Sequence, residues 1–141
     1  MSAPRDIHSY ARPHETRVAS LHLDLHVEFG ARRIRGRASL ALERSSGASS
    51  VVLDTRDLTI HRITDRDGAP LVFSLGSSHP ILGAPLEVTL APDVVEIHID
   101  YETGPGAAAL QWLAPAQTAS RRQPFLYSQG QAILTRTWIP T

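Results

Sequence analysis

Two glutamines near the end of the chain, Gln129 and Gln131, are the residues best suited to recognise a ligand. They flank Gly130 in an apolar, β-prone run over 128–141. Positions two apart on a strand project from the same face, so we expect both amides on one face of a strand. An amide both donates and accepts hydrogen bonds, which suits a peptide backbone or a terminal amine. Gly130 lets the backbone pass close to another surface or form a bulge.

A second pattern whose residue types could bind a metal is His22-x-Asp24-x-His26. Alternate residues on one strand face can converge on a metal ion, and His22 and His26 are the candidate metal ligands. Zinc would need a third protein ligand, from Glu28 or from the partner strand. The alternative is the polar outer face of an amphipathic strand, and the sequence favours this second interpretation.

Two further groups of acidic residues have structural interpretations. The pattern Glu96-x-His98-x-Asp100 has the same form as the first histidine pair and is interpreted in the same way. Asp54 and Asp57 lie between two predicted strands, where aspartate commonly caps turns by bonding its own backbone. No Gly-x-Ser-x-Gly elbow, His-Glu-x-x-His helix or glycine-rich phosphate loop is present in the sequence. The sequence therefore contains no complete catalytic centre.

Composition excludes several classes of protein. Lysine plus arginine and aspartate plus glutamate both number 14, so no net charge points to nucleic acid or an acidic membrane. The cluster Arg32, Arg33, Arg35 and Arg37 is either a solvated strand face, which we favour, or an anion site. The sequence contains no cysteine, so disulfides and thiolate metal sites are excluded. No run approaches the ~20 apolar residues of a membrane helix, and the polar start lacks a signal-peptide core, so we expect a cytoplasmic protein.

The elements that must position these residues are strands. Apolar and polar residues alternate with a period of two along most of the chain, which predicts an all-β sandwich or curved sheet in one domain, 1–141. The first two strands are expected to form an antiparallel pair, and 65–68 to form a tight turn. The region 103–119 breaks this rhythm: 107–113 is predicted to form one or two helical turns, ended by Pro115. The predicted strands are 21–29, 34–42, 51–54, 58–63, 71–75, 86–90 and 95–101.

Several segments, taken together, resemble the opening domain of the M1 zinc aminopeptidases, and most closely the leukotriene-hydrolase-like branch. They are Tyr-Ala-Arg-Pro-His-Glu at 10–15, Leu-Asp-Thr-Arg-Asp-Leu at 53–58, Tyr-Glu-Thr at 101–103, Ala-Leu-Gln-Trp-Leu at 109–113 and Phe-Leu-Tyr-Ser-Gln-Gly-Gln-Ala-Ile at 125–133. The resemblance extends along nearly the whole chain in register. The combination of Ala-Leu-Gln-Trp-Leu with Ser-Gln-x-Gln-Ala is specific, whereas no single segment is.

The resemblance implies a saddle-like β domain that packs over a thermolysin-like zinc domain. It also implies that Gln131 holds the free amino terminus of a peptide substrate and that Gln129 lines the pocket for the leading side chain. The zinc ligands and catalytic tyrosine of such enzymes have no counterpart in this sequence, so zinc is implied for the full-length family and no cofactor for this chain. We therefore expect no activity from this chain alone.

The same resemblance implies that the domain is incomplete at its C-terminal end, because further strands normally follow before the catalytic domain in cis. A sheet without its last strands has an open edge and an exposed apolar face, so we expect self-association or another chain at that edge. A stand-alone β-sandwich module that binds a protein is the alternative hypothesis.

Overall fold

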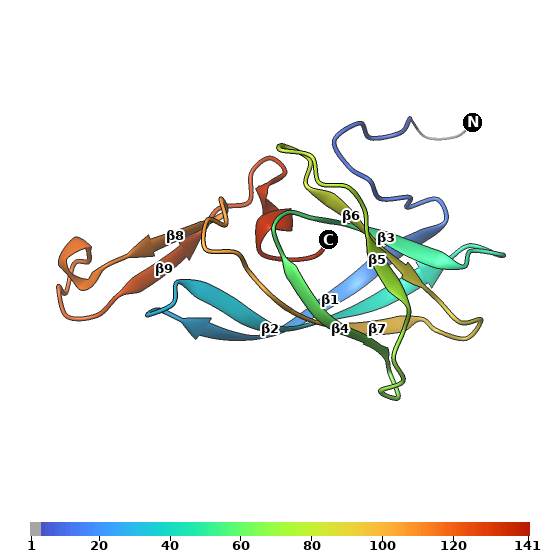
Figure 1. The fold of residues 1–141 in the computed structure, drawn as a ribbon, viewed down its shortest axis with the longest axis horizontal. Coiled ribbons are helices and arrows are strands. Elements are labelled where there is room, and N and C mark those ends of the chain that lie inside the picture. Colours follow the sequence, from blue (N-terminus) through green and yellow to red (C-terminus); the bar gives the residue numbers. More distant parts are fainter. Residues whose placement is uncertain (1–3) are drawn as a thin grey trace.

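The computed structural model describes residues 4–141, which form three antiparallel sheets (Figure 1). Sheet A has the strand order β1-β2-β7-β4, and sheet B has the order β3-β6-β5. A hairpin of β8 and β9 projects from one end of the molecule. The strands are β1 (Thr16–Glu28), β2 (Arg33–Arg44), β3 (Ser50–Thr55), β4 (Thr59–Asp65), β5 (Phe73–Leu75), β6 (Ala84–Thr89), β7 (Glu96–Glu102), β8 (Leu110–Leu113) and β9 (Phe125–Ser128).

The predicted antiparallel pair is the long hairpin of β1 and β2, in which Leu23 lies opposite Ala38 and Leu21 opposite Leu40. Its alternating pattern places apolar side chains on one face, as predicted. Gly36 on β2 leaves no room for a side chain, since a Cβ there would lie 2.1 Å from the carbonyl oxygen of Asp24 on β1. Glycine thus allows the close contact between β1 and β2.

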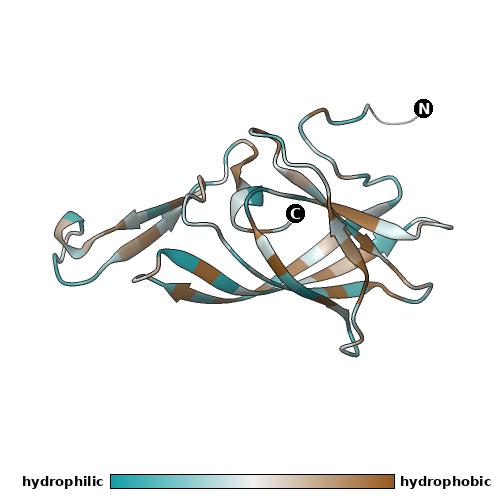
Figure 2. Cartoon of the chain, in the orientation of Figure 1, coloured by the Kyte–Doolittle hydropathy of each residue, from teal (hydrophilic) through white to brown (hydrophobic). Residues whose placement is uncertain are grey.

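The hydrophobic core lies between sheets A and B. Leu40, Ile97 and Ile99 enter it from sheet A, and Leu86 and Val88 from sheet B, all at most 1% exposed. Each buried side chain of this size contributes about 1.5–3 kcal/mol relative to an exposed one. Two sheets with a shared apolar interior constitute a β-sandwich, which confirms the predicted fold class. Figure 2 shows the corresponding alternation of apolar and polar positions along the long strands.

The outer face of sheet A is polar. Asp24, Arg37 and Asp100 lie side by side across β1, β2 and β7, and His22 lies in the next row, opposite Ser39. These positions alternate with the core residues, so their side chains point away from sheet B. This outer face therefore carries the pattern His22-x-Asp24-x-His26 on β1 and the pattern Glu96-x-His98-x-Asp100 on β7.

Two local predictions were wrong. Residues 107–113 contain no helix: Leu110–Leu113 is strand β8, and Pro115 begins a short 3₁₀-helix, Pro115–Gln117, instead of ending one. The cross-strand partner, β9, lies beyond this turn, so local pattern alone did not reveal the pairing.

In residues 4–141 no helix is long and apolar enough to cross a membrane.

The tight turn predicted at 65–68 is present. Gly68 adopts a left-handed φ of 85° and donates its N–H to the carbonyl of Asp65 at 3.1 Å. The strand after it does not return along β4, however. Apart from a bridge between Thr64 and Pro70, the chain crosses to sheet B, where β5 pairs with β6.

Candidate functional site

The two glutamines lie in a loop and not on a strand, which corrects the first prediction. Strand β9 ends at Ser128, and a turn follows before the 3₁₀-helix η2, Leu134–Thr137. Gln129 still continues the ladder by one bond, because its N–H donates to the carbonyl of Ala109 at 2.8 Å. Gln129 and Gln131 are both exposed, so the loop presents the two amides to solvent.

Gly130 brings this loop against η2, as the sequence indicated. A Cβ at Gly130 would lie 2.2 Å from Oγ1 of Thr135, closer than real contacts of that kind. The carbonyl of Gly130 also accepts the N–H of Leu134 at 3.0 Å. The loop is therefore closed tightly on the helix that follows it.

The two glutamines have different environments. The side-chain oxygen Oε1 of Gln129 accepts the backbone N–H of Gln131 at 2.8 Å, so that oxygen is engaged inside the loop. Among residues 4–141, the side-chain amide of Gln131 has no hydrogen-bond partner. Gln129 is thus held in a fixed orientation, and Gln131 keeps both its donor and its acceptor available for a ligand.

Buried side chains in η2 anchor the far end of the loop. Thr137 is a buried residue, 2% exposed. Its hydroxyl donates to the carbonyl of Leu134 at 2.7 Å and accepts the N–H of Ala109 at 3.0 Å. Ala109 therefore bonds to Gln129 through its carbonyl and to Thr137 through its N–H. A single residue thus fixes both ends of the glutamine loop.

Arg136 connects η2 to the body of the protein. It is 5% exposed, and its guanidinium donates to the carbonyls of Leu82 at 2.8 Å and His8 at 2.6 Å. Its Nη2 also lies 3.5 Å from Oδ2 of buried Asp54. Charged groups this deeply buried are almost always paired, and here three acceptors surround one cation.

Asp54 has a structural role, but not the one predicted. It lies inside β3, where its carboxylate accepts the hydroxyl of Ser9 and the backbone N–H of Tyr10 instead of capping its own turn. Sequence reasoning also missed Arg136 and Thr137. The available signal was a single arginine within the apolar end of the chain, where a charge needs a buried partner.

The hairpin that carries the loop rests on the tip of the β1-β2 hairpin. The rings of Trp112 in β8 and Phe29 meet edge to face, with centroids 5.7 Å apart. Such aromatic pairs contribute about 0.5–1.5 kcal/mol beyond their buried area. This contact fixes the outward angle of β8 and β9, and hence the direction of the loop.

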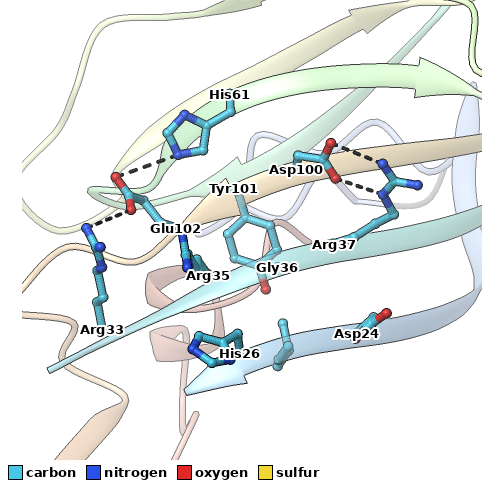
Figure 3. Close-up of a pocket in the computed structure, with 11 residues that line it drawn as sticks. Asp24, His26, Arg33, Arg35, Gly36, Arg37, His61, Asp100, Tyr101 and Glu102 are labelled. Carbon is cyan, nitrogen blue, oxygen red and sulfur yellow. Dashed lines mark hydrogen bonds and ion pairs between the residues drawn. The ribbon is translucent and has the colours of Figure 1, made fainter. Parts of the chain in front are cut away.

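The outer face of sheet A contains a shallow hollow, shown in Figure 3, where a metal or anion site was conceivable. The structure gives no support to a metal site at His22 and His26. Asp24 and His26 lie opposite Arg37 and Arg35, so the partner strand supplies cations where a third ligand was needed. Within 4–141 no three histidine, aspartate or glutamate residues gather closely enough to hold a metal ion.

Glu28, the other proposed third ligand, is engaged by arginines. Its carboxylate lies 2.5 Å from Nε of Arg33 and 2.7 Å from Nε of Arg35. The hydrogen bond from Arg33 lowers the pKa of Glu28 below its usual value of 4.5. A carboxylate already bound by two guanidinium groups is a poor metal ligand.

The arginines proposed as an anion site are also engaged in ion pairs with carboxylates of the same sheet. Arg37 binds Asp100 with Nε at 2.7 Å and Nη2 at 3.1 Å, and Arg33 also reaches Glu102 at 3.2 Å. The hydrogen bond from Arg37 lowers the pKa of Asp100. Internal carboxylates therefore neutralise Arg33, Arg35 and Arg37, which lie on a solvated strand face as favoured from the sequence, while Arg32 lies in the turn before β2.

The chain is similar to known peptidases and hydrolases over nearly all of its length. It is 39% identical to leukotriene A-4 hydrolase of Xenopus laevis over 141 residues, 96% of this chain and 23% of that protein. It is 37% identical to leucine aminopeptidase 2 of Yarrowia lipolytica over 119 residues, 82% of this chain and 18% of that protein. The chain thus spans about a quarter or less of these relatives. No family model matches it.

Solved structures show the same arrangement of strands. The structure of yeast leukotriene A4 hydrolase in complex with bestatin superposes with a TM-score of 0.89 at 26% identity, covering 99% of this chain and 23% of that one. The native enzyme from Saccharomyces cerevisiae gives a TM-score of 0.87 at 25% identity, covering 96% and 22%. The sandwich and its projecting hairpin therefore match one part of these longer enzymes.

Proposed function

Because this chain belongs with the amino-terminal β domain of the M1 enzymes, leukotriene A4 hydrolase and leucine aminopeptidase 2 among them, we propose that it recognises the amino terminus of a peptide for a zinc aminopeptidase. Gln131 is the amine anchor, and Gln129 lines the pocket for the first side chain. The observation that carries the proposal is the pair of exposed amides on a loop fixed at both ends.

The two glutamines would contribute by holding the substrate in a fixed place. The side-chain oxygen of Gln131 accepts a hydrogen bond from an N–H of the substrate's terminal ammonium group, and the positive charge strengthens this bond. Gln129 cannot rotate freely, because its Oε1 is held by the N–H of Gln131, so it offers a fixed wall to the first side chain. Holding the amine at one point places the first peptide bond at a set distance from the catalytic group.

Zinc fits the proposed enzyme but not the residues of this chain. Residues 4–141 bring no three histidine, aspartate or glutamate side chains together, and the proposal assigns the metal to a catalytic domain in cis. There it would activate water and polarise the substrate carbonyl. The chain alone should release nothing from an aminoacyl chromogenic substrate even with added zinc. The absence of cysteine agrees with a cytoplasmic location.

A chimaera tests the proposal directly. The matching segment of Xenopus leukotriene A-4 hydrolase, which aligns over 141 residues, is replaced by this chain, and release of amino-terminal residues from peptides is measured. Q131A should lower kcat/KM by about 10- to 150-fold, the equivalent of a hydrogen bond to a charged group of about 1.5–3 kcal/mol. Q129A should mainly change the preference among first side chains.

The matched control is Q123A, which removes an exposed glutamine outside the loop. It should leave kcat/KM unchanged. A folded, active chimaera in which Q131A behaves like Q123A would refute the role of Gln131. A folded chimaera without activity would count against the proposed function as a whole and favour the stand-alone binding module.

A further inference from the structure

A short turn between β5 and β6, residues 79–83, is held by the side chain of its own first residue. The Nδ1 atom of the His79 imidazole accepts the backbone N–H groups of Ile81 and Leu82, each at 3.1 Å. Pro80 has no N–H, so these are the first two amides that follow the histidine. Among residues 4–141, neither amide has another acceptor. The imidazole therefore does what an aspartate or asparagine side chain does in an Asx turn.

This arrangement requires a neutral imidazole. An Nδ1 atom that accepts hydrogen bonds carries no proton, so the proton of the ring is on Nε2. The imidazolium ion has a proton on both nitrogens and accepts no hydrogen bond. Histidine is also the side chain whose charge ordinarily changes between pH 5 and 8. Acidification therefore removes both bonds of His79 to the turn.

The far end of the turn does not depend on the imidazole. His79 and Gly83 exchange two backbone hydrogen bonds, at 2.8 and 2.9 Å, and the hydroxyl of Tyr10 donates to the carbonyl of Gly83 at 3.2 Å. Gly83 has a left-handed φ of 76°, and a Cβ there would lie 1.9 Å from the carbonyl oxygen of Thr55. Packing against the end of β3 thus fixes Gly83, whereas the imidazole fixes the N–H of Leu82.

Leu82 connects this turn to the glutamine loop. Its N–H bonds to His79, and its carbonyl accepts a hydrogen bond from Nη1 of Arg136 at 2.8 Å. Arg136 lies in η2, the helix on which the glutamine loop is closed. Release of Leu82 leaves Arg136 with the carbonyl of His8 and the carboxylate of Asp54, so η2 is loosened but not detached.

The charged and titratable groups around the turn come from three segments. They are Arg136 from η2, Arg56 just after β3, and Tyr10 and His8 from the amino-terminal segment. The imidazole of His8 lies 3.4 Å from a carboxylate of its own segment, and buried Asp54 lies beside Arg136. Within residues 4–141, the imidazole of the turn forms no ion pair with a carboxylate. Its protonated form therefore gains no counter-charge in exchange for the two lost bonds.

We propose that His79 is a positioning residue for the glutamine loop: its neutral imidazole holds Leu82 against the guanidinium of Arg136, and its protonation loosens that hold. Binding of a peptide amino terminus at Gln131 consequently weakens as the pH falls from 7.5 to 5.5. This last step rests on the proposed function, whereas the response of the turn to pH is a property of the 141-residue chain itself.

The variant H79N separates the acceptor from its titration. The side-chain oxygen of asparagine can accept the same two amides and does not change its charge between pH 5 and 8. Each neutral hydrogen bond corresponds to a factor of about 2 to 10 in an equilibrium. Amide exchange of Leu82, corrected for the intrinsic effect of pH, should therefore become about fivefold faster or more in the parent chain between pH 7.5 and 5.5. In H79N the corrected rate should be the same at both pH values.

The matched control is H22N, which changes another exposed histidine, on the outer face of sheet A. It should keep the pH response of the parent chain. Nitrogen-15 NMR of the His79 ring reports the acceptor directly, because Nδ1 should carry no proton at pH 7.5. A ring with its proton on Nδ1 would overturn the proposal. So would a corrected exchange rate of Leu82 that is independent of pH in the parent chain, or that changes as much in H79N.

The chimaera tests the step to peptide binding. At pH 7.5 the chimaera and its H79N variant should have the same kcat/KM, since both hold Leu82. At pH 5.5 the H79N variant should be about threefold more active or better, because titration of the catalytic groups affects both proteins alike and only the parent loosens its loop. Coinciding pH profiles would overturn the effect on peptide binding. An inactive chimaera would count against the proposed function, and the exchange of Leu82 then decides the inference by itself.

Discussion

Replacing Arg136 with methionine removes the cation that holds the glutamine loop to the body of the protein. The change deletes hydrogen bonds to the carbonyls of Leu82 and His8 and leaves Asp54, 5% exposed, without its counter-charge. Removing one member of a buried ion pair costs about 3–5 kcal/mol. We expect the lower end, about 3 kcal/mol, because Ser9 and Tyr10 still donate to Asp54.

For a chain of this length 1 kcal/mol corresponds to about 3 °C in Tm, so R136M should lower Tm by about 9 °C. The measurement is thermal unfolding followed by circular dichroism. The matched control is R37M, which breaks the Arg37–Asp100 pair on the outer face, where the side chains are 46% and 33% exposed. Exposed pairs contribute at most about 1 kcal/mol, so R37M should lower Tm by about 3 °C or less.

A double variant, D54N with R136M, separates charge from packing. Neutralising Asp54 removes the uncompensated buried charge, so the double variant should be more stable than R136M alone. If R136M costs no more than R37M, or if D54N destabilises R136M further, the reasoning about a buried ion pair is refuted.

Two other changes give measurable results. G130A should destabilise the chain by about 1–3 kcal/mol, because its Cβ would meet Oγ1 of Thr135, and T135A should recover most of that loss in urea titrations; a G130A variant as stable as the parent would contradict the close contact. Asp100 has a lowered pKa in the folded state, so its pair with Arg37 contributes stability above the ordinary value of 3.8 that is lost as pH falls through the lowered value. The difference in Tm between the parent and R37M should therefore shrink from pH 6 to pH 2, and a difference independent of pH would contradict this origin.

The sequence predicted the strands well where a strand's own alternation identifies its buried face. Along β1 and β2 the apolar residues repeat every second position, and the structure confirms both strands and their pairing. Strand β8 was missed because Leu110–Leu113 is only four residues long and its partner lies beyond a loop. Short strands are defined by their partners, and local pattern does not specify those.

The site was predicted in part for a similar reason. Gln129, Gly130 and Gln131 were identified from their residue types, and Gly130 does lie against η2. Their placement on a strand was wrong, because the N–H of Gln131 bonds back to Oε1 of Gln129 and the N–H of Leu134 to the carbonyl of Gly130, which turns the chain there. Arg136 acts through carbonyls of residues 8 and 82, contacts that no local window contains.

The bond between Arg136 and the carbonyl of His8 joins residues 128 positions apart in the sequence. A contact of such separation carries a large loop-closure entropy cost and slows folding. The bond from Arg136 to His8 therefore adds to the entropy cost of placing η2, whereas the bonds between Ala109 and the glutamine loop close much shorter segments. Proteolytic removal of the first ten residues would delete the carbonyl of His8 as an acceptor for Arg136, while the bonds of Ala109 to Gln129 and Thr137 would still hold the loop.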